Sequence, residues 1–317
     1  MAPFAPTARP TAWAIATLAA AAGATACTGK TLALGDRDPR PYHFEVPQIV
    51  TELRSDSRTD NPTLTADLLE IFFTSDRPGG SGGGDVWSAR RSDLLHPFSP
   101  PTAVTEVNTS TFETSSAISA DGLTLWFGSD RPGGVGSTDI WAASRPTRSA
   151  AWMTPINVDA LNTAVEDIPR PPGQHNLVMP LSSKTATAAV YQTFFAARAS
   201  AGAPFGTPVL LSALAQPDKS TVDGFLTDDG LTLFYSSAPA VAPADATVND
   251  AGMPTADLFV AFRRSVDEVL WLVQPLDDLN TPGDERDPFL TPDGKTLYFT
   301  SDRDGALNIY TASVKPR

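Results

Sequence analysis

The sequence predicts an all-β protein of the β-propeller class, with five four-stranded antiparallel blades. A segment at 119–142, SADGLTLWFGSDRPGGVGSTDIWA, returns in degenerate form along most of the chain. Its turn position recurs about every 50 to 60 residues, a period typical of solenoids, propellers and arrays. The five turn positions are Asp67, Asp121, Pro172, Asp229 and Asp293. Each copy also contains short apolar runs separated by Gly- and Pro-rich turns, as stacked four-stranded sheets require.

Within one copy, the elements follow in a fixed order. Asp121-Gly122 lies between two apolar runs, and because Gly tolerates a positive φ this dipeptide predicts a tight hairpin. The run LTLWFGS that follows is apolar on both faces, which predicts a strand covered on both sides. SDRPGG makes a second turn, DIWA a third strand, and AWMTPINV from Ala151 a weaker fourth strand.

The copies differ in how well they keep this pattern. The first begins at Thr65, the second at Ser119 and the fifth at Thr291, and these three match closely. The fourth begins TDDGLTLFYSS at Thr227, and the third, PPGQHNLVMPLSS from Pro171, is badly worn. The pattern S-x-D-G-x-x-L-x-F-x-S-D-R-x-G-G…D-I-W resembles the WD40-like propeller repeat of TolB-type periplasmic proteins. The resemblance covers 61–314 and implies a propeller fold, which by itself says little about activity.

The N-terminal part is expected to close the ring. HFEVPQIVTEL from His43 matches the fourth-strand segments WMTPINVDALN and WLVQPLDDLN of other copies. The fifth copy ends near Arg317 without a fourth strand of its own. A strand donated from the N-terminus would therefore complete the fifth blade and remove two unpaired edges. Six blades, the alternative suggested by TolB, would need a further copy that the sequence does not show.

The first residues predict export. Residues 1–27 have one positive charge, Arg9, followed by a small apolar run that is too short for a comfortable membrane span. Ala24-Thr25-Ala26-Cys27 resembles a bacterial lipobox, with Cys27 as the lipidation site. An ordinary signal peptide cut after Ala26 is the alternative. Residues 28–42 are expected to form a tether, and residues 43–317 a single propeller domain. A lipid anchor would be the only membrane contact, on a periplasmic or outer-membrane-anchored protein.

The composition excludes several classes of function. A formal net charge of -13 repels phosphate backbones, so nucleic acid is not expected as a partner. His43, His96 and His175 are scattered without the spacing of metal ligands, and no phosphate loop or dinucleotide motif occurs, so neither metal nor cofactor is expected. GGSGG at 79–83 fits G-x-S-x-G, but it lies in a glycine turn where a nucleophile elbow needs a strand and a helix. No catalytic residue is therefore assigned.

The candidate ligand site is the mouth of the central channel, where the loops entering each first strand are acidic. Aligned on the turns, Asn61, Ser115, Asp167, Asp223 and Asp287 would ring this mouth, with Glu113 close by. The S-D-R turns bring Arg77, Arg131 and Arg303 to the same face. Such a funnel could bind a cation, a basic peptide or a polar sugar. Alternatively, the carboxylates cap turns and pair with the arginines.

These observations favour a non-catalytic, exported propeller that binds a protein or a cell-envelope polymer on its loop face. The TolB resemblance implies partners associated with peptidoglycan. A five-bladed ring with channel carboxylates is also similar to arabinanase-type glycosidases. The alternative is therefore a glycan-processing enzyme that uses two of these carboxylates as acid and as base or nucleophile.

Overall fold

The computed structural model describes residues 42–184, 190–241 and 254–316. The chain divides into two units, Met1–Pro39 and Arg40–Arg317, and every described residue belongs to the second. No helix in this described part of the chain is long and apolar enough to cross a membrane.

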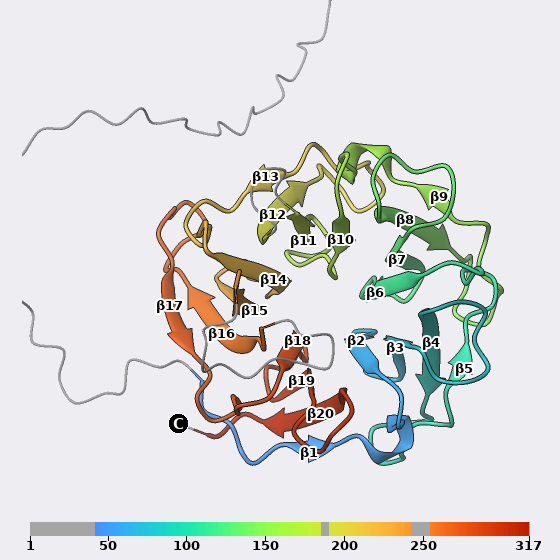
Figure 1. Ribbon diagram of the computed structural model, residues 1–317, viewed down its shortest axis with the longest axis horizontal. Coiled ribbons are helices and arrows are strands. Elements are labelled where there is room, and N and C mark those ends of the chain that lie inside the picture. Colours follow the sequence, from blue (N-terminus) through green and yellow to red (C-terminus); the bar gives the residue numbers. More distant parts are fainter. Residues whose placement is uncertain (1–41, 185–189, 242–253, 317) are drawn as a thin grey trace, which may run out of the picture. The chain divides into compact units, whose positions relative to one another are not determined.

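The second unit is a five-bladed propeller, as the repeat predicts (Figure 1). Each blade is a four-stranded antiparallel sheet whose first strand lies at the channel and whose fourth lies at the rim. Blade 1 contains β2 (Thr59–Leu64), β3 (Glu70–Ser75), β4 (Asp85–Arg90) and β5 (Thr102–Ala103). Blade 2 contains β6 (Glu113–Ile118), β7 (Thr124–Ser129), β8 (Asp139–Ser144) and β9 (Ile156–Asn157).

The other three blades follow the same plan. Blade 3 contains β10 (Asp167–Pro169), β11 (Val178–Lys184), β12 (Tyr191–Ala197) and β13 (Val209–Leu210). Blade 4 contains β14 (Lys219–Leu226), β15 (Thr232–Pro239), β16 (Asp257–Phe262) and β17 (Leu272–Pro275). Blade 5 contains β18 (Glu285–Leu290), β19 (Thr296–Ser301), β20 (Asn308–Ser313) and β1 (Gln48–Ile49).

The N-terminal strand closes the ring, which confirms the sequence prediction. In β1, Gln48 pairs with Thr311 and Ile49 with Tyr310 of β20, and a further bridge joins Phe44 to Val314. The short 3-10 helix η1 (Thr51–Leu53) then leads into blade 1, and η2 (Asp159–Leu161) leads into blade 3. Because the first and last parts of the propeller share one sheet, blade 5 cannot form without residues from both.

The apolar core lies between neighbouring blades. One cluster joins Phe72 and Val86 of blade 1 to Ile118 and Phe127 of blade 2, and all four side chains are buried. This arrangement explains why the second strands are apolar on both faces, since each face packs against a different blade. The aromatic side chains at the third-strand position, Trp87, Trp141 and Tyr310, are buried in the same way.

The repeated Asp and Gly residues shape the turns. In the second blade, Ser119 Oγ lies 2.6 Å from Asp121 Oδ1, which also accepts a hydrogen bond from the Leu123 backbone N–H. The glycine turn of that blade folds around the Asp139 carboxylate, which accepts from the N–H groups of Val135 and Gly136. A Cβ added to Gly134 would lie 1.7 Å from Asp139 Oδ2, so this turn requires Gly.

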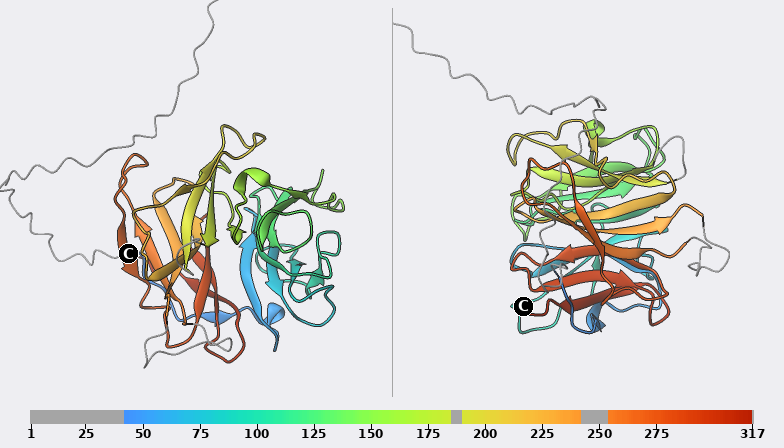
Figure 2. Two further views of the ribbon diagram at one scale, coloured as in Figure 1. Left: turned by 45° about the horizontal axis from the view of Figure 1, so that its top comes forward. Right: turned by 90° about the vertical axis from the view of Figure 1, so that its left-hand side faces the viewer.

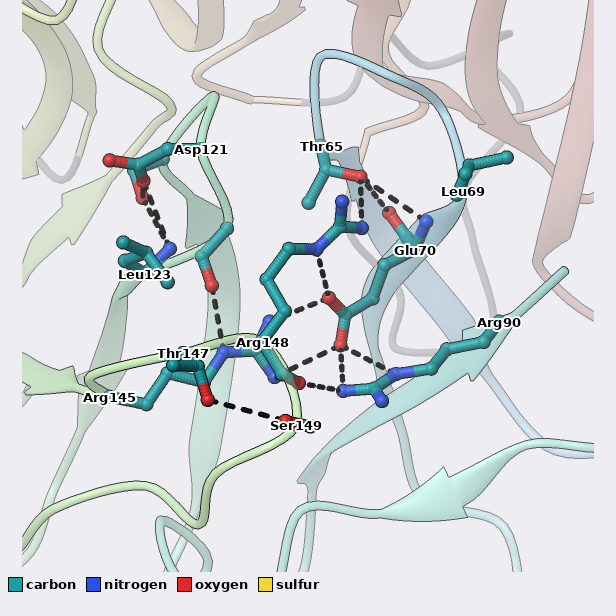
Figure 3. Close-up of polar contacts among 12 residues, drawn as sticks. Thr65, Leu69, Glu70, Arg90, Asp121, Leu123, Arg145, Thr147, Arg148 and Ser149 are labelled. Carbon is teal, nitrogen blue, oxygen red and sulfur yellow. Dashed lines mark hydrogen bonds and ion pairs between the residues drawn. The ribbon is translucent and has the colours of Figure 1, made fainter. Parts of the chain in front are cut away.

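A buried ion cluster fastens blade 1 to blade 2 (Figure 3). Glu70, whose side chain is 1% exposed, accepts from Arg90 of its own blade at 2.7 Å and from Arg145 of blade 2 at 2.6 Å. Arg148 reaches both Glu70 and Asp67 from the loop after β8. Three guanidinium groups from two blades thus converge on one carboxylate.

Seen from the side, the strands run between the two ends of the ring (Figure 2). We call the end at which the chain enters β2, β6, β10, β14 and β18 the entry end. The other end, where the hairpins between first and second strands lie, is the hairpin end.

Candidate functional site

A polar pocket of about 230 Å³ lies at the entry end of the channel, and we call it the entry pocket. Its charged lining residues come from the first strands of blades 1, 4 and 5 and from the residue before β2. They are Arg58, Asp60, Asp223, Arg286 and Asp287. Tyr191 of blade 3 and Ser115 of blade 2 complete a ring to which all five blades contribute.

Backbone bulges place the side chains at this mouth. In four of the five first strands the pairing register shifts by one residue, as in a β-bulge. The residue that takes the left-handed conformation at each bulge is Asn61, Ser115, Asp223 or Asp287, with φ between 52° and 60°. Asn and Asp adopt this conformation more readily than other non-Gly residues. The bulges direct Asn61, Asp223 and Asp287 to the entry pocket, which all three line.

Arg170 crosses the channel beneath these residues. It belongs to blade 3 and is 1% exposed, and its Nη1 donates to Asn61 Oδ1 of blade 1 at 2.7 Å and to Asp287 Oδ1 of blade 5 at 3.2 Å. Asp223 Oδ1 of blade 4 is 3.8 Å away. One buried guanidinium therefore links four blades near the axis.

Asp287 is the most perturbed acid of the channel. Its Oδ2 accepts from the Asn61 N–H and from Thr300 Oγ1, at 3.1 and 2.9 Å. Burial and the neighbouring Asp223 raise the pKa of Asp287 to about 8, although Arg170 opposes the shift. Two carboxyl groups share a single guanidinium here, which favours the protonated form of this acid.

The rim of the entry pocket carries paired charges. Arg58 Nη1 lies 3.4 Å from Asp60 Oδ2, and Arg286 Nε donates to Asp284 Oδ1 at 2.7 Å. Asp60 raises the pKa of Arg58 above its usual value. About a third of each arginine side chain, 33% for Arg58 and 29% for Arg286, is exposed. Both guanidinium groups therefore keep donor capacity for a ligand while a carboxylate holds them in place.

Asp167 and Glu113 do not reach this pocket, and the expected place of Asp167 in the ring was wrong. Asp167 is fully buried and its Oδ2 accepts from Thr163 Oγ1 at 2.8 Å. Glu113 is bound in the same way by Thr109, at 2.7 Å. Because β10 pairs with β11 without a bulge, Asp167 occupies the position of Glu113 at the start of the first strand, and the mouth receives no carboxylate from blade 3.

The three arginines of the S-D-R turns lie outside the pocket and bond within their own blades and to the segment that leads into each blade. Arg131 donates to Ser129 Oγ, to the Val107 carbonyl and to Glu113, and its guanidinium lies over the rings of Phe127 and Trp141. Arg77 and Arg303 make the equivalent contacts to Leu53 and Leu279. Their donors are thus engaged within the blades, in line with the structural alternative for these residues.

The predicted lipidation site falls outside the described residues, because Cys27 precedes Tyr42. Residues 242–253, between β15 and β16 of blade 4, are not described either. Ala238, Ala240 and Pro254, which flank that gap, line the entry pocket.

Sequence reasoning missed Arg170, Asp60, Arg58 and Arg286. Arg58 and Arg286 lie in the entry loops close in sequence to the candidate residues Asn61 and Asp287. That position could have identified them as pocket residues. Arg170 follows β10 at the register position that Thr63, Ala117, Phe225 and Phe289 occupy in other blades. The other copies have an uncharged residue at this position of the first strand. The charge that the third copy has there could have predicted that Arg170 lies in the channel. Among the described residues, no three His, Cys, Asp or Glu side chains group as they would around a metal ion.

Comparisons with known proteins identify the fold. No family model and no curated protein matched the sequence. Among solved structures, an endo-arabinase from Bacteroides thetaiotaomicron aligns with a TM-score of 0.56 and 12% identity, over 88% of this chain and 99% of that one. A glycosyl hydrolase from Bacteroides ovatus aligns with a TM-score of 0.52 and 12% identity, over 85% and 93%. A putative TolB from Agrobacterium tumefaciens has a TM-score of 0.48 and 13% identity, over 85% and 89%. At these identities the first two alignments show a shared fold and nothing further.

Proposed function

We propose that this protein is an exported, non-catalytic propeller that binds a protein or an envelope polymer at the entry pocket. The observation that carries the proposal is the pairing of the channel acids. Asp60 faces Arg58, and Asp223 and Asp287 share Arg170. Such pairs form a rigid polar surface with both signs of charge, which suits recognition of a ligand carrying hydroxyl, amino and carboxyl groups.

Peptidoglycan fragments are the first ligands to test, since they carry all three groups. Calorimetric titration of muropeptides into the protein is expected to show binding without products in the mixture. Arg58→Ala with Arg286→Ala removes the two exposed guanidinium groups and is expected to weaken binding tenfold or more. Arg264→Ala, an exposed arginine after β16, is the matched control and should bind normally. An unchanged affinity for muropeptides in the Arg58→Ala, Arg286→Ala variant would contradict the proposal. Binding to an envelope protein but not to muropeptides would favour a protein partner.

The export route is part of the same proposal, with Cys27 as a lipid-bearing residue of the mature protein. The motif Ala24-Thr25-Ala26-Cys27 supports it. Mass spectrometry of the N-terminal peptide from the membrane fraction of expressing bacteria should find acylated Cys27. An unmodified Cys27 at a cleaved N-terminus would show that the protein is secreted without a lipid anchor.

A second candidate function is glycan hydrolysis. The pKa of Asp287 is raised to about 8 by burial and by the neighbouring Asp223, as that of a general acid is raised beside a carboxylate in glycosidases. The shared fold with an endo-arabinase is compatible with this role. However, both oxygens of Asp287 already have partners within the protein. The test is whether any glycan that binds is also cleaved to released sugars. Cleavage by the unaltered protein that is lost in Asp223→Asn and in Asp287→Asn would show hydrolysis and overturn the binding proposal.

A further inference from the structure

A second pocket, the hairpin pocket, lies at the opposite end of the channel and has a volume of about 360 Å³. All five blades contribute to it, through Leu64, Ile118, Pro171, Phe225 and Phe289, among others. We infer that this pocket binds a basic peptide segment through one bulky apolar side chain.

Its walls suit an apolar group. Phe225 and Phe289 lie with ring centroids 4.9 Å apart, and Leu64 and Ile118 are buried beside them. Pro171 and Pro172 form the wall on the side of blade 3. The volume lies in the lower part of the usual range for ligand pockets, roughly 300–1,000 Å³, and accommodates a single large side chain with room for its backbone.

The rim gives the ligand its sign of charge. The charged lining residues of the hairpin pocket are Asp228, Asp229 and Asp293, and no Lys or Arg of the described part of the chain lines it. Asp293 Oδ1 accepts from Thr291 Oγ1 at 2.7 Å, and this bond lowers the pKa of Asp293. Its side chain remains 52% exposed, and Lys295 Nζ lies 3.7 Å from Asp293 Oδ2, so Asp228 and Asp229 are the rim acids without this cation beside them. Ionised carboxylates fixed around an apolar pocket favour Lys and Arg flanking the inserted side chain, and they repel an acidic segment.

The third copy diverges most from the repeat, and its blade gives the rim of the hairpin pocket no carboxylate. Gln174, His175 and Asn176 all have positive φ, and the His175 N–H donates to Asp228 Oδ1 at 3.1 Å. A Cβ added to Gly173 would lie 2.4 Å from the Leu226 carbonyl oxygen, so this hairpin packs directly against blade 4. Blade 3 therefore supplies an apolar wall where blades 4 and 5 supply carboxylates, and the basic residues of the peptide are expected over blades 4 and 5.

The hairpin pocket is separate from the entry pocket. Pro171 and Pro172 line the hairpin pocket, while the side-chain partners of the preceding Arg170 line the entry pocket. The Arg170 guanidinium thus lies between the two, and each pocket can be tested without the other.

Calorimetric titration of the peptide Lys-Lys-Phe-Lys-Lys into the full chain tests the inference. Binding is expected, and Lys-Lys-Ala-Lys-Lys and Glu-Glu-Phe-Glu-Glu should bind at least tenfold more weakly. Ala66→Trp places a large ring at the exposed edge of the pocket and should weaken binding at least tenfold. The combined D228N, D229N and D293N variant keeps the oxygen acceptors of the turns, removes the charges and should also weaken binding.

A matched variant, E52Q with D56N and E106Q, removes three exposed acids outside the pocket and should bind normally. Circular dichroism establishes that each variant is folded, and the Asn variant decides the matter if Ala66→Trp does not fold. No binding of the Phe peptide, equal binding of the Ala peptide, or equal weakening in both acid-removal variants would each overturn the inference. Loss of binding on Asp60→Asn with Asp223→Asn alone would assign the peptide to the entry pocket.

Discussion

Single residues show where local and tertiary effects compete in this channel. Asp, Gly and Ser of the repeat form turns through contacts within a few residues of one another, so their roles are readable from their spacing. Arg170 is different, because its partners Asn61 and Asp287 are more than 100 positions away. A charge with partners that distant can be recognised as unusual in the sequence, but its ion pairs follow only from ring closure.

The buried Asp287 predicts a pH-dependent stability. Its pKa is raised to about 8 in the fold, whereas an unfolded Asp ionises near pH 4. Between these values the folded chain holds a proton that the unfolded chain has lost, so the contribution of this group to the unfolding free energy falls as the pH rises from about 4 to about 8. Asp287→Asn should flatten this fall in urea unfolding between pH 5 and pH 8.

The informative quantity is the slope of the unfolding free energy against pH, because a pH-independent cost of the substitution does not change this slope. The exposed Asp56→Asn is the control and should keep the slope of the unaltered protein. An Asp287→Asn slope equal to that of the control would show that Asp287 is already ionised at pH 5.

Secondary-structure elements explain both the success and the error of the site prediction. The bulges of β2, β6, β14 and β18 keep Asn61, Ser115, Asp223 and Asp287 in register, and counting back from the hairpin turns finds these residues. β10 has no such bulge, so the alignment of the third copy on Pro172 misplaces Asp167. A bulge depends on how the first strand pairs with the second strand. The divergent sequence of the third copy therefore does not show that its bulge is missing.

Between elements, the ion cluster around Glu70 predicts a large effect on stability. Glu70→Gln keeps the shape of the side chain but leaves Arg90, Arg145 and Arg148 without their shared anion. Removing one partner of a buried ion pair costs about 3–5 kcal/mol. Urea unfolding should therefore show a loss of that size, while Glu106→Gln on the exposed surface should change little. A loss below about 1 kcal/mol would mean that the cluster adds little to the join between blades 1 and 2.

At the scale of the whole molecule, ring closure joins the two ends of the propeller in blade 5. The pairing of β1 with β20 and the buried side chain of Phe44 make the N-terminal segment part of that blade. The fold therefore has no complete fifth sheet until the whole chain is present, which is a form of long-range cooperativity.

Deletion of residues 43–53 tests the closure. It removes β1, Phe44 and Leu53, exposes the edge of β20 and should lead to aggregation, because unpaired apolar edges recruit other chains. Size-exclusion chromatography with light scattering would detect it. A stable monomer with an unchanged thermal midpoint would show that β1 is dispensable.

The sequence by itself determined the class of the fold, the number of blades, the closing strand and, among the channel acids, the positions of Asp223 and Asp287. These properties follow from local turn chemistry and from strand patterns repeated at a fixed period. The tertiary structure alone decided that the S-D-R arginines bond within their own blades, that Arg170 spans the channel and that two pockets of different chemistry lie at its ends. Those outcomes depend on which side chains of five distant blades meet around one axis, and no local pattern in the sequence encodes that meeting.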